Sequence, residues 1–212
     1  MSYKTKDDIR IDLKLLHPWL QEKIKKWLKL CHKEGYYVML NMGFRSVQEQ
    51  NQLYAQGRTK PGAIVTQVSG DSYGSQHQWG IAVDFGCAAT TLDEIYNEKR
   101  MKAIAQLAKK VGLAWGGDWI GFKDTPHIYL PKWGDTPSKL KKKYKTFDKF
   151  KKTWYRTIKK KTRIYGSKKL SKKNVKKQVT KDTKVTVLYY TKTYAKVKYG
   201  DIKGYVYRTR IK

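Results

Sequence analysis

The sequence has few acidic residues and no long apolar run. Only 17 of its 212 residues are Asp or Glu, against 47 Lys or Arg, so the formal net charge is +30. Such a charge predicts strong attraction to polyanions, whether nucleic acid, anionic lipid or bacterial wall polymers, and does not choose among them. A membrane span needs about 18 consecutive apolar residues, and the absence of such a run excludes one.

Cysteine is also scarce. Cys31 and Cys87 are too few for a disulfide framework, and neither belongs to a Cys-x-x-Cys pair. We therefore expect buried free thiols rather than a structural bridge or metal ligands. The N-terminal segment lacks the apolar core of a secretory signal, so we expect synthesis in the cytoplasm and a different exit route for any work outside.

The composition changes sharply near residue 148. Residues 1–148 hold 24 Lys or Arg and 15 Asp or Glu, a net of +9, whereas residues 149–212 hold 23 and 2, a net of +21. A chain of this length can form two domains with real cores. We place the boundary between residues 148 and 149.

The first part reads as an α+β domain, with a small antiparallel sheet flanked by helices. Apolar spacing predicts helices over residues 12–33, with a possible break at Pro18, and over residues 95–111. A strand is predicted over residues 36–42, and Ser46 begins a capping box that predicts another helix. The long polar loop that follows contains one short β-like piece, Ile64-Val65-Thr66, and loops of this length often line binding sites.

The second part alternates polar residues with β-branched and aromatic ones. This pattern recurs over residues 184–188, 194–199 and 204–207, with a turn at Gly200-Asp201. Period-two patterning between turns predicts several short antiparallel strands. About 60 residues of such strands favour a small all-β barrel.

One stretch in the first domain places ionisable groups among apolar residues. His77 precedes Asp84, which interrupts the apolar run of residues 81–85. A buried carboxylate is costly unless a cation or hydrogen-bond donors compensate it. Further along, Asp124 and His127 lead into a second strand-like run.

Two histidines and a carboxylate form a common catalytic zinc shell that leaves one position for water. His77, Asp84 and His127 could supply these ligands if their strands lie side by side, with Asp124 as the base and Arg45 as the stabiliser of a developing oxyanion. Each signal is weak alone. His77 could instead be a loop residue, His127 a core histidine and Arg45 an ordinary surface arginine.

The motifs together resemble the zinc peptidases of the D-alanyl-D-alanine carboxypeptidase and L-alanyl-D-glutamate endopeptidase group. The group's Ser-x-His-x-x-Gly-x-Ala-x-Asp signature is met over residues 75–84, and its downstream acidic residue and histidine are met by Asp124 and His127. Longer runs around Arg45, over residues 53–62 and over residues 116–124 resemble the endopeptidase branch. The dipeptidase branch has glutamate where this sequence has Asp124. The resemblance covers about residues 5–130.

This resemblance implies a role for each candidate residue. His77, Asp84 and His127 are expected to bind Zn²⁺, Asp124 to act as the general base, and Arg45 to bind substrate and stabilise the transition state. We also place Ser75 and Trp79 among the substrate-binding residues; for Trp79, packing on the sheet is the alternative.

The tail resembles bacterial SH3-like wall-binding modules, on the residues of its alternating segments and on Thr162-Arg-Ile-Tyr165. The resemblance implies that residues 149–212 hold the enzyme on peptidoglycan or on an anionic wall polymer. Tethering of this kind raises the local substrate concentration without altering the catalytic site.

The function predicted is that of a peptidoglycan-degrading endolysin that hydrolyses the L-Ala-D-Glu bond of the stem peptide. We expect a monomer with no specific nucleic-acid partner, which reaches the cell wall after release at lysis; a bacterial autolysin is an alternative origin. The nearest rival function is a D-Ala-D-Ala carboxypeptidase or dipeptidase on the same scaffold. Less favoured are a basic polyanion-binding protein with a structural zinc and a wall-binding protein that has lost catalysis.

Overall fold

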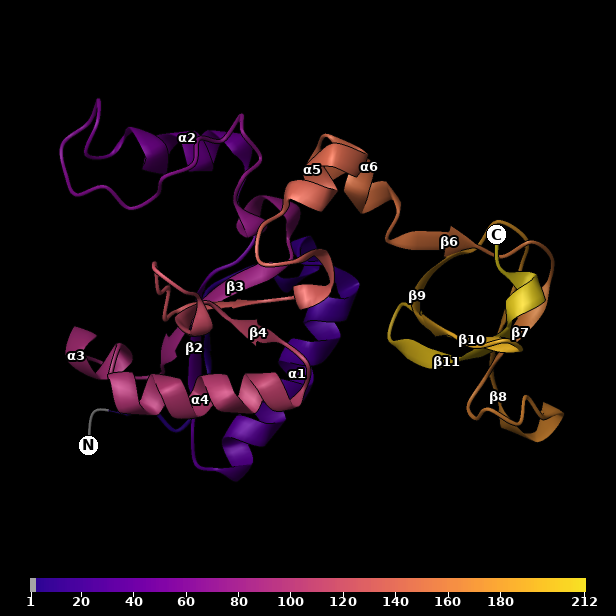
Figure 1. Cartoon of the computed structure of the whole chain (residues 1–212). Coiled ribbons are helices and arrows are strands. Elements are labelled where there is room, and N and C mark those ends of the chain that lie inside the picture. Colours follow the sequence, from indigo (N-terminus) through magenta and orange to yellow (C-terminus); the bar gives the residue numbers. More distant parts are fainter. Residues whose placement is uncertain (1–2) are drawn as a thin grey trace. The chain divides into compact units, whose positions relative to one another are not determined.

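The structure, a computed structural model, describes residues 3–212 and contains two compact units (Figure 1). The first unit ends at Phe147, and the second comprises Asp148–Lys212. Each unit contains one sheet, of five strands in the first and six in the second. Within the described residues, no helix is both long and apolar enough to cross a membrane.

The first long helix of the first unit is α1 (Pro18–Lys33), which follows a short 3-10 turn at Leu13–Leu15. Pro18 occupies the first turn of α1, where a missing backbone N–H costs nothing. The side chain of His17 caps the helix, since its Nδ1 accepts a hydrogen bond from the Trp19 N–H at 3.1 Å. The predicted break at Pro18 is confirmed.

The helix expected over residues 95–111 begins three residues later than predicted, because residue 95 belongs to a separate short helix. A short helix, α3 (Leu92–Ile95), ends before Asn97, and α4 (Glu98–Lys110) begins after it. The Asn97 side chain accepts a hydrogen bond from the Arg100 N–H at 3.1 Å, so it caps a new helix. Helices α1 and α4 then pack together, and the Trp27 indole of α1 donates a hydrogen bond to the Ile104 carbonyl oxygen of α4 at 2.9 Å.

The sheet of the first unit has the strand order β1-β2-β3-β5-β4. Its strands are β1 (Asp8–Ile9), β2 (Val38–Met42), β3 (Ala82–Cys87), β4 (Ala114–Trp115) and β5 (His127–Tyr129). The pairs β2–β3, β3–β5 and β4–β5 are antiparallel, as predicted. The two-residue strand β1 is not among the predicted strands, and it pairs with β2 in parallel.

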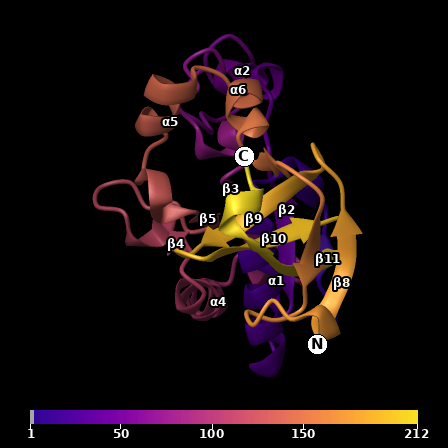
Figure 2. The ribbon, with the colours of Figure 1, turned by 90° about the vertical axis from the view of Figure 1, so that its right-hand side faces the viewer.

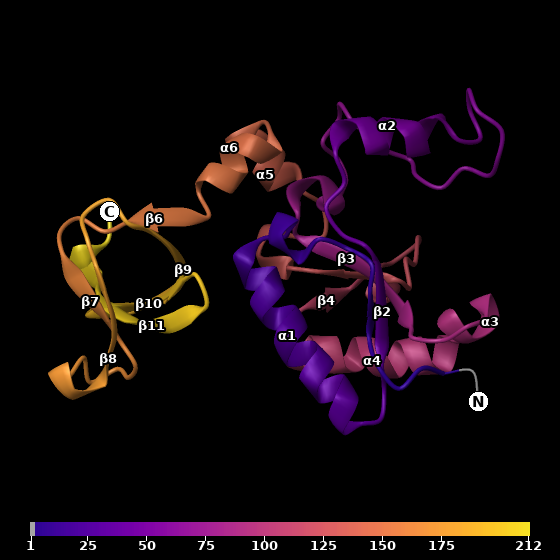
Figure 3. The same ribbon diagram turned by 180° about the vertical axis from the view of Figure 1, so that it is seen from behind.

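Helices α1 and α4 cover one face of this sheet (Figures 1 and 3). Phe85 of β3 points to that face, where its ring meets Trp27 edge-on at 5.4 Å between ring centres. Successive strand residues point to opposite faces. Asp84 therefore points away from the two helices, and so does its partner His127, which lies directly opposite on β5.

The remaining helices of this unit are short. Ser46 caps α2 (Val47–Ala55) with the predicted capping box, and α5 comprises Ser138–Tyr144. The β-like piece predicted at residues 64–66 is wrong, because the chain forms no strand there and Ile64 and Val65 are exposed. In that loop the structure has only an isolated bridge between Gln56 and Lys60.

Both cysteines are buried free thiols, as expected. Cys31 lies on α1 and Cys87 at the end of β3. Burial raises the pKa of the Cys31 thiol to about 12, and the charge of Asp7 adds to the shift. A thiol with this pKa is almost never ionised near neutral pH, so Cys31 acts as a packing residue.

The second unit is all-β apart from its first residues and two 3-10 turns. Helix α6 (Phe147–Lys152) leads into a sheet of order β6-β9-β10-β11-β7-β8. The strands are β6 (Tyr155–Thr157), β7 (Thr162–Tyr165), β8 (Val175–Val179), β9 (Lys184–Tyr190), β10 (Tyr194–Tyr199) and β11 (Ile202–Tyr207). All neighbouring pairs are antiparallel, and Figure 2 shows how the sheet curls.

The curled sheet encloses a separate apolar core. Its buried members are β-branched and small residues, namely Ile158, Ile164, Val179, Val185, Ala195, Val197, Val206 and Ile211. Ala195 and Val197 alternate along β10 with the partly exposed Lys196 and Lys198. The alternation predicted from the sequence thus separates a small core from a strongly basic surface.

Candidate metal centre

Three side chains from three elements meet on the face of the first sheet that is turned away from α1 and α4. His77 lies on the 3-10 turn Gln76–Trp79, Asp84 on β3 and His127 on β5. Antiparallel pairing places Asp84 directly opposite His127. The turn that carries His77 ends at Gly80, whose φ of +62° suits glycine, and a Cβ there would lie 2.7 Å from the Leu15 carbonyl oxygen.

The ligand atoms of these residues point at one another. His77 Nε2 and His127 Nδ1 are 3.2 Å apart, and each is 3.1 Å from Asp84 Oδ1. Both histidines are 4% exposed. Asp84 is partly exposed, which leaves an approach from solvent.

The outer nitrogen of each histidine has its own hydrogen-bond partner. His77 Nδ1 lies 2.8 Å from the Gly43 carbonyl oxygen, and His127 Nε2 lies 2.7 Å from Gln76 Oε1. Both partners are acceptors, so each outer nitrogen carries the proton and each inner nitrogen keeps its lone pair. The Gln76 amide is itself held, since its Nε2 donates a hydrogen bond to the Gly134 carbonyl oxygen at 3.1 Å.

The charge of Asp84 is stabilised in this cluster. Burial alone would raise the pKa of Asp84, but the electrostatic interaction with His77 and His127 outweighs burial and holds the pKa well below its usual range. The carboxylate that looked out of place in an apolar strand is thus an anion between two imidazoles.

Asp124 lies at the edge of the cluster, with Oδ2 3.9 Å from His127 Nδ1 and its side chain 35% exposed. Burial raises the pKa of Asp124 above its usual value. Gly116 makes room for it: a Cβ on Gly116 would lie 2.6 Å from the Asp124 carbonyl oxygen and 3.0 Å from His127 Cβ. The Asp124 N–H also donates a hydrogen bond to the Gly116 carbonyl oxygen at 3.1 Å.

Arg45 is anchored beside the same cluster. Its backbone N–H donates to the His77 carbonyl oxygen at 3.2 Å, and its Nη1 donates to Gln50 Oε1 at 2.8 Å. Gln50 is fully buried and is fixed in turn by the Val68 carbonyl oxygen. Burial lowers the pKa of Arg45, against the opposing charges of Asp84, Glu49 and Asp124. The buried Nε of Arg45 has no hydrogen-bond partner within the described chain.

The two other residues expected to bind substrate differ in placement. Ser75 is partly exposed at the start of the turn that carries His77. Trp79 is 0% exposed, and its indole donates a hydrogen bond to the Tyr73 carbonyl oxygen at 3.0 Å. A side chain without exposed surface cannot contact a substrate, so the substrate-binding role predicted for Trp79 is wrong. Trp79 instead packs in the core.

The residue that sequence reasoning missed is Gln76. It precedes His77, but its amide serves His127, and no spacing rule links these two positions. The structure brings together His77, Asp84, Asp124 and His127, with Arg45 held against His77, and leaves out Trp79.

Two imidazole nitrogens and a carboxylate oxygen, with all three residues' ligand atoms within 4.8 Å, define a candidate site for a metal-dependent hydrolase. Comparison of this chain with known proteins indicates the same class of protein. Residues 69–130 match the family described as D-alanyl-D-alanine carboxypeptidase. Over 124 residues, or 54% of this chain and 73% of the relative, the sequence is 35% identical to peptidoglycan L-alanyl-D-glutamate endopeptidase CwlK of Bacillus subtilis. The chain belongs to the same family of metallopeptidases and is an enzyme.

Two further relatives match over smaller shares. The sequence is 38% identical over 106 residues to the L-alanyl-D-glutamate peptidase of Listeria phage A118, a match over 49% of this chain and 34% of the relative. Among solved structures, the L-Ala D-Glu endopeptidase ChiX of Serratia marcescens is 22% identical, with a TM-score of 0.41, over 56% of this chain and 82% of that chain.

The residues present fit zinc. Zinc binds imidazole nitrogen and carboxylate oxygen at about 2.0–2.2 Å, and tetrahedral ligands at that radius are roughly 3.4 Å apart. The three ligand atoms here are 3.1 to 3.2 Å apart. Both imidazoles also have the outer hydrogen-bond acceptor that zinc-binding histidines usually have.

Proposed function

We propose that this chain hydrolyses the L-Ala-D-Glu bond of the peptidoglycan stem peptide, with zinc held by His77, Asp84 and His127. The observation that carries the proposal is the convergence of His77 Nε2, Asp84 Oδ1 and His127 Nδ1 at one point of the sheet. The substrate follows from the activity in the names of the Bacillus and Listeria phage relatives.

Each residue would have a separate task. Zinc bound by the three ligands would polarise the scissile carbonyl and acidify water. Asp124 would accept the proton of the attacking water, because its partly exposed carboxylate lies beside the ligands without joining them. Arg45, held by Gln50, would donate from its partly exposed guanidinium to the oxygen on which negative charge develops.

Ser75 would contribute to the substrate site from its partly exposed position at the start of the same turn. We further propose that residues 1–148 form the catalytic domain and that residues 149–212 form an SH3-like domain that anchors the enzyme to the wall. The antiparallel, curled sheet and the net charge of +21 support that role. The enzyme would thus act at the bacterial cell wall, as a phage endolysin or as a bacterial autolysin.

The test of catalysis is digestion of purified peptidoglycan of known stem chemistry, followed by mass analysis of the fragments. We expect new D-Glu N-termini. Release of free D-Ala without them would instead favour a D-Ala-D-Ala carboxypeptidase, the activity in the description of the matched family.

A matched pair of variants tests the base. Asp124→Asn should lower the hydrolysis rate by about 100-fold or more, the scale of general base catalysis, while zinc stays bound. Asp118→Asn is the control, since Asp118 is an exposed carboxylate of the same connecting segment that pairs with Lys109. Equal activity of the Asp124 variant and the control would contradict the assignment of the base.

A further inference from the structure

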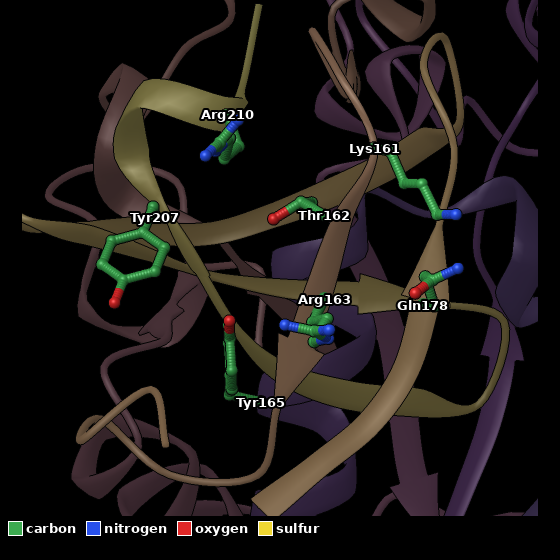
Figure 4. A pocket seen from close by; sticks show the side chains of 7 residues that line it. All are labelled: Lys161, Thr162, Arg163, Tyr165, Gln178, Tyr207 and Arg210. Carbon is green, nitrogen blue, oxygen red and sulfur yellow. The ribbon is translucent and has the colours of Figure 1, made fainter. Parts of the chain in front are cut away.

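A polar pocket of about 280 Å³ lies on the second unit (Figure 4). Three cations line it: Lys161, Arg163 and Arg210. No Asp or Glu lines it, and residues 149–212 contain only two acidic residues. Cations gathered without a counter-charge repel one another, and a bound anion would relieve that repulsion.

The strands place Arg163 at the centre of this pocket. Arg163 and Tyr165 lie two residues apart on β7, so they share a face, while Ile164 between them points into the core. On one side, Gln178 of β8 pairs directly with Arg163. On the other side, β11 pairs with β7 and brings Tyr207 to the pocket.

The hydrogen-bonding groups of the pocket are mostly donors. Within the described residues, no ion pair or side-chain hydrogen bond involves Arg163, Arg210 or Lys161. The two guanidinium groups and the ammonium group can therefore bind a ligand. Thr162 and Gln178 add a hydroxyl and an amide to the lining. A guanidinium binds two oxygens of one oxyanion at once, and charge-assisted hydrogen bonds of this kind are strong.

We propose that this pocket binds one phosphate group of a polyol-phosphate polymer of the bacterial wall. Arg163 and Arg210 would hold the phosphate oxygens, and Tyr165 and Tyr207 would contact the neighbouring polyol. The volume of the pocket is at the lower end of the range for ligand sites, so the pocket suits one repeat of a polymer rather than a long peptide. The inference deepens the wall-anchoring role proposed for residues 149–212 and rests on it.

Nucleic acid also carries phosphodiesters, but the pocket suits it less. Proteins that bind single strands usually line a groove with aromatic faces on which bases stack. Here Tyr165 is only 7% exposed, and its ring meets that of Tyr207 at 82°, edge to face. The two rings therefore form walls of a hollow rather than an open stacking platform.

The test is calorimetric titration of the full-length protein with a synthetic glycerol-phosphate hexamer at fixed salt. Arg163→Gln and Arg210→Gln should each weaken binding by about tenfold or more, since each removes a charged hydrogen-bonding partner. Arg163→Lys keeps the charge but loses the paired donors, so its affinity should fall between those of the native protein and Arg163→Gln.

Arg208→Gln is the matched control. It removes the same charge two residues from Arg210, but Arg208 lies over the Tyr190 ring and does not line the pocket. Its effect should be roughly twofold or less, as for an exposed charge at screened range. Equal losses in all the glutamine variants would overturn the proposal, because they would reveal unspecific attraction.

Further measurements distinguish the remaining explanations for binding. A DNA hexamer that binds as tightly as the glycerol-phosphate hexamer, with the same dependence on Arg163, would overturn the proposal in favour of nucleic acid. Absence of hexamer binding by the native protein would overturn it as well. Specific hexamer binding by a protein that fails to cleave the stem peptide would support this inference while contradicting the proposed catalysis.

Discussion

Replacement of Gln76 by leucine should weaken zinc binding although Gln76 is not a ligand. In the native protein Gln76 Oε1 accepts a hydrogen bond from His127 Nε2 at 2.7 Å, on the side of the ring away from Asp84. This bond keeps the proton on Nε2 and the lone pair on Nδ1, which faces the other two ligands. Leucine has no acceptor, so the ring of His127 loses both its orientation and its preferred tautomer.

The magnitude follows from the burial of the pair. Gln76 and His127 are each 4% exposed, so water does not readily replace the lost acceptor. Loss of the outer partner of a zinc-binding histidine typically costs 10- to 100-fold in metal affinity, or about 1.4 to 2.8 kcal/mol. The unpaired N–H should also lower the free energy of unfolding of the metal-free protein by about 1–3 kcal/mol.

The assay is zinc competition against a chromophoric chelator, combined with urea unfolding of the metal-free protein. Gln78→Leu is the matched control, because Gln78 is a buried glutamine of the same turn whose amide donates a hydrogen bond to the Gly70 carbonyl oxygen and does not bond a metal-binding histidine. Both variants should lose stability, and only Gln76→Leu should lose zinc affinity. Equal zinc affinity in the two variants would refute the positioning role of Gln76.

Three further predictions follow from the first unit. Gly116→Ala should destabilise the protein by about 1–3 kcal/mol in urea unfolding and lower zinc affinity, because its Cβ would push against Asp124 and His127. Zinc removal by a chelator should lower the melting temperature, and zinc added back should restore it, since metal that binds only the folded state stabilises that state. Burial, with the charge of Lys132, lowers the pKa of His17 from 6.5 to about 3, so the folded state binds fewer protons in this range. The free energy of unfolding should therefore fall as the pH drops from 6.5 toward 3, by at most about 1.4 kcal/mol per pH unit. His17→Asn, which keeps a helix cap, should show a shallower fall in acid urea titrations; an unchanged slope would contradict this account.

Local patterns in the sequence account for much of the fold. The capping box at Ser46, the break at Pro18 and the alternation along residues 194–199 depend on neighbours in the chain, so the sequence alone predicts them. The split at Asn97 escapes such patterns, because a continuous apolar period over two helices looks the same as one helix. The exposed β-like piece at residues 64–66 misleads for a related reason, since strand propensity without a pairing partner does not make a strand.

The sequence by itself predicted which residues form the candidate centre, because the weak signals of His77, Asp84 and His127 combine into one motif together with the residues around them. Only the tertiary structure decided how they meet. Pairing of β3 with β5 set Asp84 opposite His127, and the fold carried Gln76 to a histidine distant in sequence. The same packing buried Trp79 and removed it from the substrate site. Register and burial depend on contacts between segments far apart in the chain, and no local pattern encodes them.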